Sequence, residues 1–180
     1  MTRAATPGQT VGPFFGFALP FAGGAHLVPP GHPAAVQLTG RVLDGAGAPV
    51  PDALLEIWQP DADGSIAQHA GSVHRDGFTF TGWGRAATDN DGRYRFTTVR
   101  PGPVADGVPF IAMTIFARGL LDRLFTRVYL PGTADDTLLA ALPPDRRRTL
   151  IAEDGDRQLR FDIRLQSPDE TVFLRYPAAG

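Results

Sequence analysis

The sequence contains no cysteine, no lysine and no long uninterrupted apolar run. The absence of cysteine excludes disulfide bonds, zinc–thiolate sites and thiol catalysis. The absence of lysine makes all 17 positive charges arginines, an excess that compositional bias explains and from which no function follows. The apolar stretch at residues 14–21 is short and interrupted by Gly16 and Pro20, so it predicts neither a signal peptide nor a membrane span. A cytoplasmic location is therefore expected.

The charge balance indicates no polyanionic partner. The net charge of −2 leaves no global basic field that would favour binding to nucleic acid or to an anionic membrane. With 180 residues, of which 43% are hydrophobic, the chain is long enough for one compact domain with a substantial core. Its 21 glycines and 17 prolines indicate many turns between short elements. They do not indicate disorder, because the apolar content is too high for a disordered chain.

Within this single domain, residues 1–35 predict an extended N-terminal arm and residues 36–180 a β-sandwich. The many prolines and glycines of the arm leave no room for a regular element. The arm also carries four phenylalanines between positions 14 and 21, which need an apolar surface to cover them. That surface belongs either to the chain's own sandwich or to another subunit.

From Val36 onward, apolar and polar residues alternate with the period of two that is typical of half-buried strands. Clusters of Asp, Asn and Gly separate these stretches, as turns require. The segments expected to form strands are 36–42, 53–59, 82–88, 94–98, 110–117, 125–130, 158–166 and 171–176. The segment 110–117 is almost entirely apolar, which predicts a strand covered on both faces.

One convincing helical stretch lies between Asp135 and Ile151. Either Asp135 or Asp136 can cap its first turn, and Pro143-Pro144 breaks it. Many short strands separated by turns favour an antiparallel sandwich over a βαβ arrangement. The predicted fold is therefore all-β, an antiparallel β-sandwich with an extended N-terminal arm and one or two short helices.

Possible metal ligands are scattered along the chain. The histidines are His26, His32, His69 and His74. They form no His-x-His pair, which would place two imidazoles on one face of a strand, so solvated loop histidines are the simpler interpretation. Two Asp- and Gly-rich segments, 61–64 and 89–92, resemble the start of a calcium loop but lack its bidentate glutamate. They predict Asx-type β-turns instead.

Arg118 follows the apolar segment 110–117 and precedes Gly119, where the end of a strand would present its guanidinium at a rim. For a strand-end arginine considered alone, a surface salt bridge is the simpler interpretation. Composition and isolated motifs together support a β-sandwich and no specific reaction.

An ordered series of short motifs resembles the intradiol ring-cleavage dioxygenases. The motifs are Gln9-Thr10-Val11-Gly12-Pro13, Gly40-Arg41-Val42-Leu43-Asp44, Leu55-Glu56-Ile57-Trp58-Gln59, the segment 88–96 (TDNDGRYRF), Arg100-Pro101-Gly102-Pro103, Phe116-Ala117-Arg118-Gly119, Thr126-Arg127-Val128-Tyr129 and Arg160-Phe161-Asp162-Ile163. Gly-Arg-Val-x-Asp alone also occurs in other sandwich modules, but the full ordered series is specific and covers nearly the whole chain. The resemblance implies a β-sandwich of the intradiol dioxygenase type.

In that family the catalytic chain holds Fe(III) with two tyrosinates and two neutral histidines, because hard phenolate oxygens suit ferric iron. The resemblance assigns these four ligand positions to Ile66, Val104, Phe110 and Ala112, none of which can bind iron. It therefore implies a chain without a metal site and without catalytic residues of its own. Its partner would be a homologous β subunit that holds the Fe(III).

In the family, such a metal-free chain also lines the cleft of its catalytic partner. The matching residues here are Thr10, Gly12, Pro13 and Arg118. Small arm residues would let the backbone approach the substrate, and Arg118 would offset the charge of a carboxylated catechol. The resemblance thus implies that the complex cleaves protocatechuate with O2 to give 3-carboxy-cis,cis-muconate.

Two alternatives remain open at this point. One is a transthyretin-like β-sandwich binding module without enzymatic activity, although a carrier has no need for the long aromatic arm. The other is an iron enzyme that uses unrelated ligands, such as His69 and His74.

Overall fold

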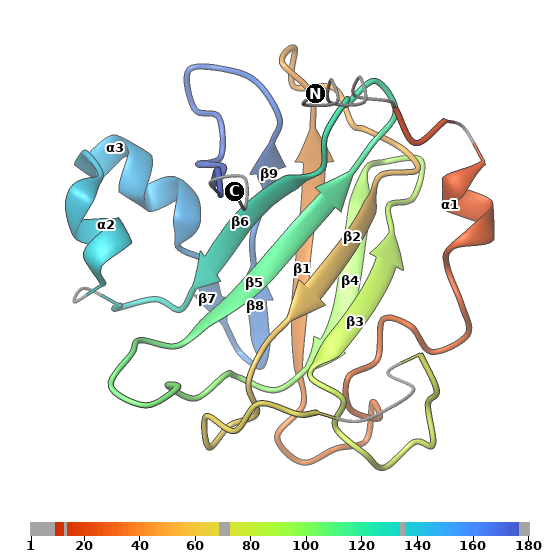
Figure 1. Ribbon diagram of the computed structural model, residues 1–180, viewed down its shortest axis with the longest axis vertical. Coiled ribbons are helices and arrows are strands. Elements are labelled where there is room, and N and C mark those ends of the chain that lie inside the picture. The colour runs from red at the N-terminus through yellow and green to blue at the C-terminus, as the bar shows by residue number, and fades with distance from the viewer. Residues whose placement is uncertain (1–9, 13, 69–72, 134–135, 177–180) are drawn as a thin grey trace, which may run out of the picture.

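Two β-sheets packed face to face form the body of the protein in the computed structural model, which describes residues 10–12, 14–68, 73–133 and 136–176 (Figure 1). The first sheet contains β1 (Val36–Leu43), β4 (Arg93–Thr98), β7 (Glu153–Gly155), β8 (Gln158–Arg160) and β9 (Ile163–Arg164). The second sheet contains β2 (Leu54–Trp58), β3 (Trp83–Ala87), β5 (Phe110–Phe116) and β6 (Leu124–Tyr129). Their orders are β4-β1-β8-β7, with β9 paired to β1, and β3-β2-β5-β6.

The strands expected between residues 36 and 130 are confirmed to within one residue at each end. The core lies between the sheets, where inward side chains such as Leu38 of β1 and Ile57 of β2 are buried. The expectation that the strand at 110–117 is covered on both faces is wrong. In β5, residues such as Ile111 are buried, whereas the alternate residues are only partly buried, because no layer covers the outer face completely.

The arm contains one helical turn, α1 (Phe15–Ala18), so the expectation that it holds no regular element is wrong. The turn directs Phe15 into the protein, where it is 7% exposed. It leaves Phe14 and Phe17 on the outside, at 77% and 85% exposed. The chain's own sandwich therefore covers only part of the aromatic surface of the arm.

Residues 24–28 of the arm close one edge of the sandwich. The backbone N–H of Leu27 donates to the carbonyl of Thr97 on β4 at 2.8 Å. The N–H of Arg85 on β3 donates to the carbonyl of Gly24, also at 2.8 Å. The arm thus bridges the edge strands of both sheets and satisfies backbone groups that would otherwise be unpaired.

The helical elements are α2 (Thr137–Ala141), α3 (Pro144–Arg147) and a 3₁₀ turn (Arg148–Leu150). They lie to one side of the sandwich, next to β6 (Figure 1). The predicted cap at Asp136 is confirmed, since its Oδ1 accepts from the N–H groups of Leu138 at 2.8 Å and Leu139 at 3.1 Å. Asp135 lies outside the described residues. Within the described part of the chain, no helix is long and apolar enough to cross a membrane.

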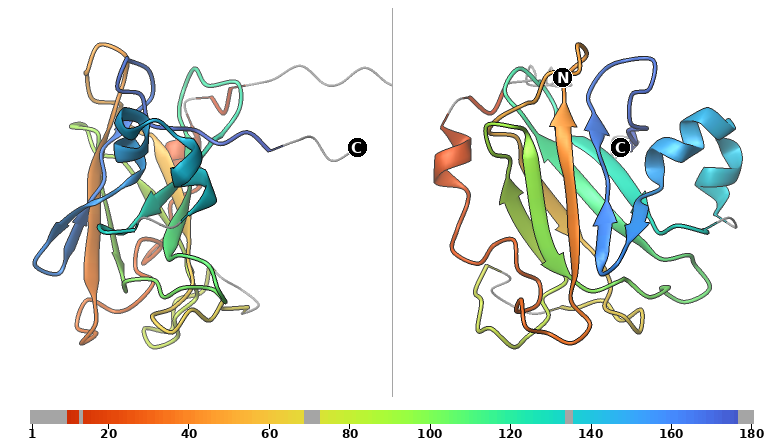
Figure 2. Two further views of the ribbon diagram at one scale, coloured as in Figure 1. Left: turned by 90° about the vertical axis from the view of Figure 1, so that its left-hand side faces the viewer. Right: turned by 180° about the vertical axis from the view of Figure 1, so that it is seen from behind.

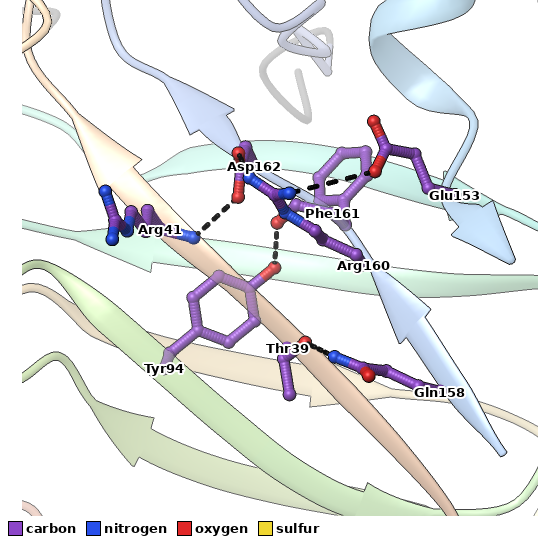
Figure 3. A network of polar contacts seen from close by, with 8 residues as sticks. All are labelled: Thr39, Arg41, Tyr94, Glu153, Gln158, Arg160, Phe161 and Asp162. Carbon is purple, nitrogen blue, oxygen red and sulfur yellow. Dashed lines mark hydrogen bonds and ion pairs between the residues drawn. The ribbon is translucent and has the colours of Figure 1, made fainter. Parts of the chain in front are cut away.

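The single long strand expected at 158–166 is split into β8 and β9, and both run parallel to β1, whereas the other strand pairs described are antiparallel. The split falls at Phe161, opposite Gly40, where an added Cβ would lie 1.8 Å from the Phe161 carbonyl oxygen. The Tyr94 hydroxyl donates to that carbonyl, and Asp162 accepts a backbone N–H of β1 at 3.0 Å (Figure 3). Side chains therefore take two backbone partners at this break, while the Phe161 N–H still donates to the Thr39 carbonyl at 2.8 Å.

The strand expected at residues 171–176 does not form. Among the described residues, the segment makes one isolated bridge, in which the Leu174 N–H donates to the Phe125 carbonyl at 2.7 Å. The Val172 carbonyl accepts from the Thr126 hydroxyl at 2.9 Å instead of from a backbone N–H. A side chain that competes for a backbone partner keeps this segment irregular.

Candidate functional site

The arm and the loop after β5 meet at one end of the second sheet. The Thr10 hydroxyl accepts a hydrogen bond from the backbone N–H of Gly119 at 3.1 Å. Gly12 and Gly119 have φ angles of +76° and +86°, a backbone conformation that favours glycine. Thr10, which was expected at a cleft, is thereby bonded to the residue next to Arg118. Pro13 lies outside the described residues.

Arg118 forms an ion pair with Asp52 at this end of the sheet. Its Nη2 lies 3.0 Å from Asp52 Oδ2, and its Nε donates to Oδ1 at 3.3 Å. The two side chains are 54% and 29% exposed, so the pair remains accessible to solvent. Asp52 belongs to the turn before β2 and has a φ of +55°. The salt bridge and the exposed guanidinium expected for Arg118 are thus both present. An anion that binds Arg118 therefore shares the guanidinium with Asp52.

Ile66 and Val104 lie on two loops that are bonded to each other. The backbone N–H of Gly102 donates to the carbonyl of Asp61 at 2.7 Å. A Cβ at Gly102 would lie 2.3 Å from the carbonyl oxygen of Ala62, so the loops approach closely. Ile66 and Val104 are 47% and 42% exposed.

Phe110 and Ala112 lie on the outer face of the second sheet, where β5 begins. Ala112 stands opposite Trp58 of β2 and opposite Arg127 of β6. The guanidinium carbon of Arg127 lies 4.2 Å from the centroid of the Phe110 ring. A cation stacked on an aromatic face is a favourable contact, and it fills the space beside Phe110.

Arg127 is connected to Tyr129 and Asp136. Its Nη1 donates to the Tyr129 hydroxyl at 3.1 Å, and that hydroxyl donates to Asp136 Oδ1 at 2.9 Å. Burial raises the pKa of Tyr129 to about 12, and the hydrogen bond to Asp136 acts in the same direction. The phenol therefore stays protonated at neutral pH and acts as a donor that links β6 to α2.

The region around Arg118 and the region around Phe110 lie at opposite ends of β5 (Figure 1). Phe110 begins the strand and Arg118 follows its end, so at about 3.3 Å per residue they are roughly 26 Å apart. The structure therefore does not bring the arm and Arg118 to Phe110 and Ala112 of the same chain.

The described histidines make separate contacts at different places in the structure. His26 forms a parallel bridge with Thr97 at the edge of the sandwich, and the Nδ1 of His32 accepts from the N–H of Ala34 at 3.2 Å. His69 lies outside the described residues. In the part of the chain that the structure describes, no group of three or more His, Asp or Glu side chains could hold a metal ion.

The two calcium-like segments form the expected Asx turns. Asp61 Oδ1 accepts from the N–H groups of Asp63 at 2.9 Å and Ser65 at 2.8 Å. Asp89 Oδ1 accepts in the same way from Asp91 at 2.9 Å and Arg93 at 2.8 Å. Each carboxylate accepts hydrogen bonds from the backbone of its own turn, which confirms the prediction of Asx-type turns.

Comparison with known proteins identifies the family. A family model described as Dioxygenase matches residues 12–108, more than half of the chain. The chain is 39% identical to the protocatechuate 3,4-dioxygenase alpha chain of Burkholderia cepacia, over 96% of this chain and 98% of that one. The chain belongs to the intradiol ring-cleavage dioxygenase family.

Two further dioxygenases extend the comparison. The protocatechuate 3,4-dioxygenase beta chain of Burkholderia cepacia is 35% identical, over 78% of this chain and 68% of that one. The dioxygenase domain of a dioxygenase–carbohydrate-binding fusion from Streptomyces sp. SirexAA-E is 25% identical, with a TM-score of 0.60 over 94% of this chain and all of that one. The predicted sandwich and family are confirmed, and nothing here favours the transthyretin-like binding module.

Intradiol dioxygenases depend on iron, so the residues at the four expected ligand positions can be tested against it. Ile66, Val104, Phe110 and Ala112 offer no nitrogen or oxygen on their side chains. The cationic guanidinium of Arg127 lies over the Phe110 ring, and its positive charge repels a metal ion. The residues at these positions do not fit iron.

Two residues at these sites were not identified from the sequence. Arg127 stands in a period-two segment, so the alternation could have located it on the outer face with Phe110 and Ala112. Asp52 follows a proline in a turn, where no periodic signal relates it to Arg118, 66 positions later. Only the tertiary structure brings that pair together.

Proposed function

We propose that this chain is the alpha subunit of a protocatechuate 3,4-dioxygenase. The proposed reaction cleaves protocatechuate between its two hydroxylated carbons and adds both atoms of O2, giving 3-carboxy-cis,cis-muconate. The observation that carries the proposal is the 39% identity over 96% of this chain and 98% of an alpha chain of that enzyme. The beta chain from the same organism matches less of this chain, 78%, which favours the alpha assignment. A cytoplasmic location is part of the proposal.

The proposal assigns the Fe(III) to a homologous beta subunit. It is supported by the chemistry of the four expected ligand positions, which carry only hydrocarbon side chains. The cation of Arg127 over Phe110 supports it further, since this positive charge repels a metal ion. His69 and His74 are the alternative ligands within this chain.

The contribution of this chain to the chemistry would come from Thr10, Gly12, Pro13 and Arg118. Arg118 and Thr10 lie roughly 26 Å from Phe110 of the same chain, which supports a role at another chain's site. The half-exposed guanidinium of Arg118 can donate charge-assisted hydrogen bonds to a substrate carboxylate. The small arm residues would let the backbone close over the substrate and exclude water.

The test is co-expression of this chain with its neighbouring beta-type reading frame, followed by separation of the subunits and metal analysis of each. We expect one iron per beta subunit, none in this chain, and dioxygenase activity in the combined complex. Each subunit purified alone is the control. Stoichiometric ferric iron with a tyrosinate charge-transfer colour in this chain alone would contradict the assignment. Full activity after His69→Ala and His74→Ala together would exclude the alternative ligands.

A further inference from the structure

A groove of about 820 Å³ crosses the outer face of the first sheet, on the side of the sandwich away from Phe110 and Ala112. Residues of β1, β4 and β8 line it, together with arm residues between positions 20 and 26, and at the sheet edge it reaches residues 85–87 of β3 in the second sheet. No described helix lies over this face (Figure 2, right). The volume is within the range of sites that bind small molecules.

The groove is rich in positive charge. Its charged lining residues in the described chain are Arg41, Arg85, Arg93, Arg95, Arg160, Asp89 and Asp162. Five arginines thus stand against two aspartates, although the chain as a whole has a net charge of −2. A concave surface with one sign of charge focuses the field and raises the local concentration of counter-ions.

Three of the arginines surround Thr39. In the pairing registers, Arg95 of β4 and Arg160 of β8 both stand opposite Thr39, on its two sides. Arg41 lies two residues further along β1, on the same exposed face. Side chains on neighbouring strands are about 5 Å apart when opposite and about 7–8 Å apart on the diagonal, so these guanidinium groups can reach one small ligand.

Three arginines of the groove already have partners, and the first is Arg85, whose Nη2 lies 2.5 Å from Glu56 Oε1. Arg160 donates to Asp162 at 2.7 Å and lies 4.0 Å from Glu153 (Figure 3). Arg93 pairs with Asp91. The hydrogen bond to Asp162 raises the pKa of Arg160, so this guanidinium keeps its charge. These arginines contribute to the field of the groove but offer fewer free donors.

Arg41 and Arg95 have no such partners. Both are exposed, and neither guanidinium forms a hydrogen bond or ion pair with another described residue. Arg41 engages Asp162 only through its backbone N–H, and its guanidinium points away from that carboxylate (Figure 3). Arg41 also stands directly opposite Arg93, and of these two arginines Arg93 is the one that pairs with Asp91.

We propose that this groove binds a small polycarboxylate anion. Each planar guanidinium matches one carboxylate with two parallel hydrogen bonds, so the two unpaired arginines call for at least two carboxylates. The Thr39 hydroxyl, which accepts from the Gln158 amide at 2.8 Å, is a neutral polar group opposite Arg95 and two residues before Arg41 on β1. The proposal does not depend on the proposed function.

The test is calorimetric titration of the assembled complex at about 0.15 M salt with three anions built on one ring. Benzoate, isophthalate and benzene-1,3,5-tricarboxylate carry one, two and three carboxylates. We expect the tricarboxylate to bind one per chain and at least about tenfold more tightly than benzoate. The Arg41→Gln/Arg95→Gln variant should weaken that binding at least about tenfold.

The matched control is Arg148→Gln/Arg175→Gln, which removes the same charge from exposed arginines outside the groove and should bind as the unmodified protein does. Anion binding at a catalytic cleft is common to both variants, so their difference reports the groove alone. Equal losses in the two variants, or inorganic phosphate binding as tightly as the tricarboxylate, would overturn the proposal. Failure of the Arg41→Gln/Arg95→Gln chain to enter the complex on gel filtration would also overturn it, because the face would then be a subunit contact.

Discussion

Arg118 and Asp52 form a two-point ion pair, with Nη2 3.0 Å from Oδ2 and Nε 3.3 Å from Oδ1. The pair connects the loop after β5 to the turn before β2, and the Thr10 hydroxyl binds the next residue, Gly119. The arm, the turn and the loop therefore meet around one guanidinium that remains 54% exposed. Any anion that approaches this corner competes with Asp52 for Arg118.

Replacing Arg118 with alanine should weaken the binding of a carboxylated catechol to the complex. Loss of a charge-assisted hydrogen bond to the carboxylate predicts a KM that is roughly tenfold higher, or a lower turnover, with iron content unchanged. Stability should change by less than about 1 kcal/mol, because the ion pair is half-exposed. Steady-state kinetics and metal analysis of the complex check this. Unchanged kinetics would remove Arg118 from the site, and partial recovery in Arg118→Lys would support a role for its charge.

Asp52→Asn should have the opposite effect on KM. The change removes the competing carboxylate but keeps the side-chain shape, and asparagine tolerates the φ of +55° at this position. A freer Arg118 should lower KM for the carboxylated substrate by about threefold, which corresponds to a weak exposed ion pair. The same steady-state assay compares the two variants. A raised KM in Asp52→Asn would mean that Asp52 positions Arg118 instead of competing for it.

The two sides of α1 predict different results for two phenylalanines. Phe15 is 7% exposed, so Phe15→Ala should lower the unfolding free energy by about 3–5 kcal/mol. Phe17 is 85% exposed, so Phe17→Ala should change it by less than about 0.5 kcal/mol. Denaturant unfolding of each variant gives these values. If another subunit covers the arm, Phe17→Ala should weaken assembly on gel filtration while leaving the unfolding free energy unchanged. Equal effects of Phe15→Ala and Phe17→Ala in both assays would contradict this separation.

The buried Tyr94 hydroxyl should contribute to stability in a pH-dependent way. Burial raises the pKa of Tyr94 well above its usual value of 10, so the folded state favours the protonated phenol. Its contribution is therefore full below about pH 10 and is lost as the pH rises beyond that value. Tyr94→Phe should cost about 1–3 kcal/mol at neutral pH, because the Phe161 carbonyl loses its donor. Thermal unfolding between pH 7 and 11 tests this: the variant should lose less stability above pH 10, and parallel curves would contradict it. Tyr129, whose pKa is also raised, retains a dependence of the same sign in both proteins.

Much of the sandwich was predictable because a strand buried on one face needs apolar residues at every second position. This pattern located β1 to β6 to within one residue, and the Asp136 cap was readable from its chemistry. The pattern failed where long-range contacts decide the backbone. Gly40 lets Phe161 approach β1 closely, and the strand expected there is divided into β8 and β9. The Val172 carbonyl accepts from the Thr126 hydroxyl instead of from a backbone N–H of a neighbouring strand. The division into an arm of residues 1–35 and a sandwich of residues 36–180 stays a prediction.

By itself, the sequence determined the β-sandwich, the family and the absence of metal-binding side chains at Ile66, Val104, Phe110 and Ala112. These follow from residue types and their local spacing, which each segment carries on its own. Only the tertiary structure decided that Asp52 pairs with Arg118, that Arg127 covers Phe110, and that unpaired Arg41 and Arg95 share one groove. The physical reason is that an ion pair, a stacked cation or a charged groove depends on distance in space, and strand pairing brings together residues that lie far apart along the chain.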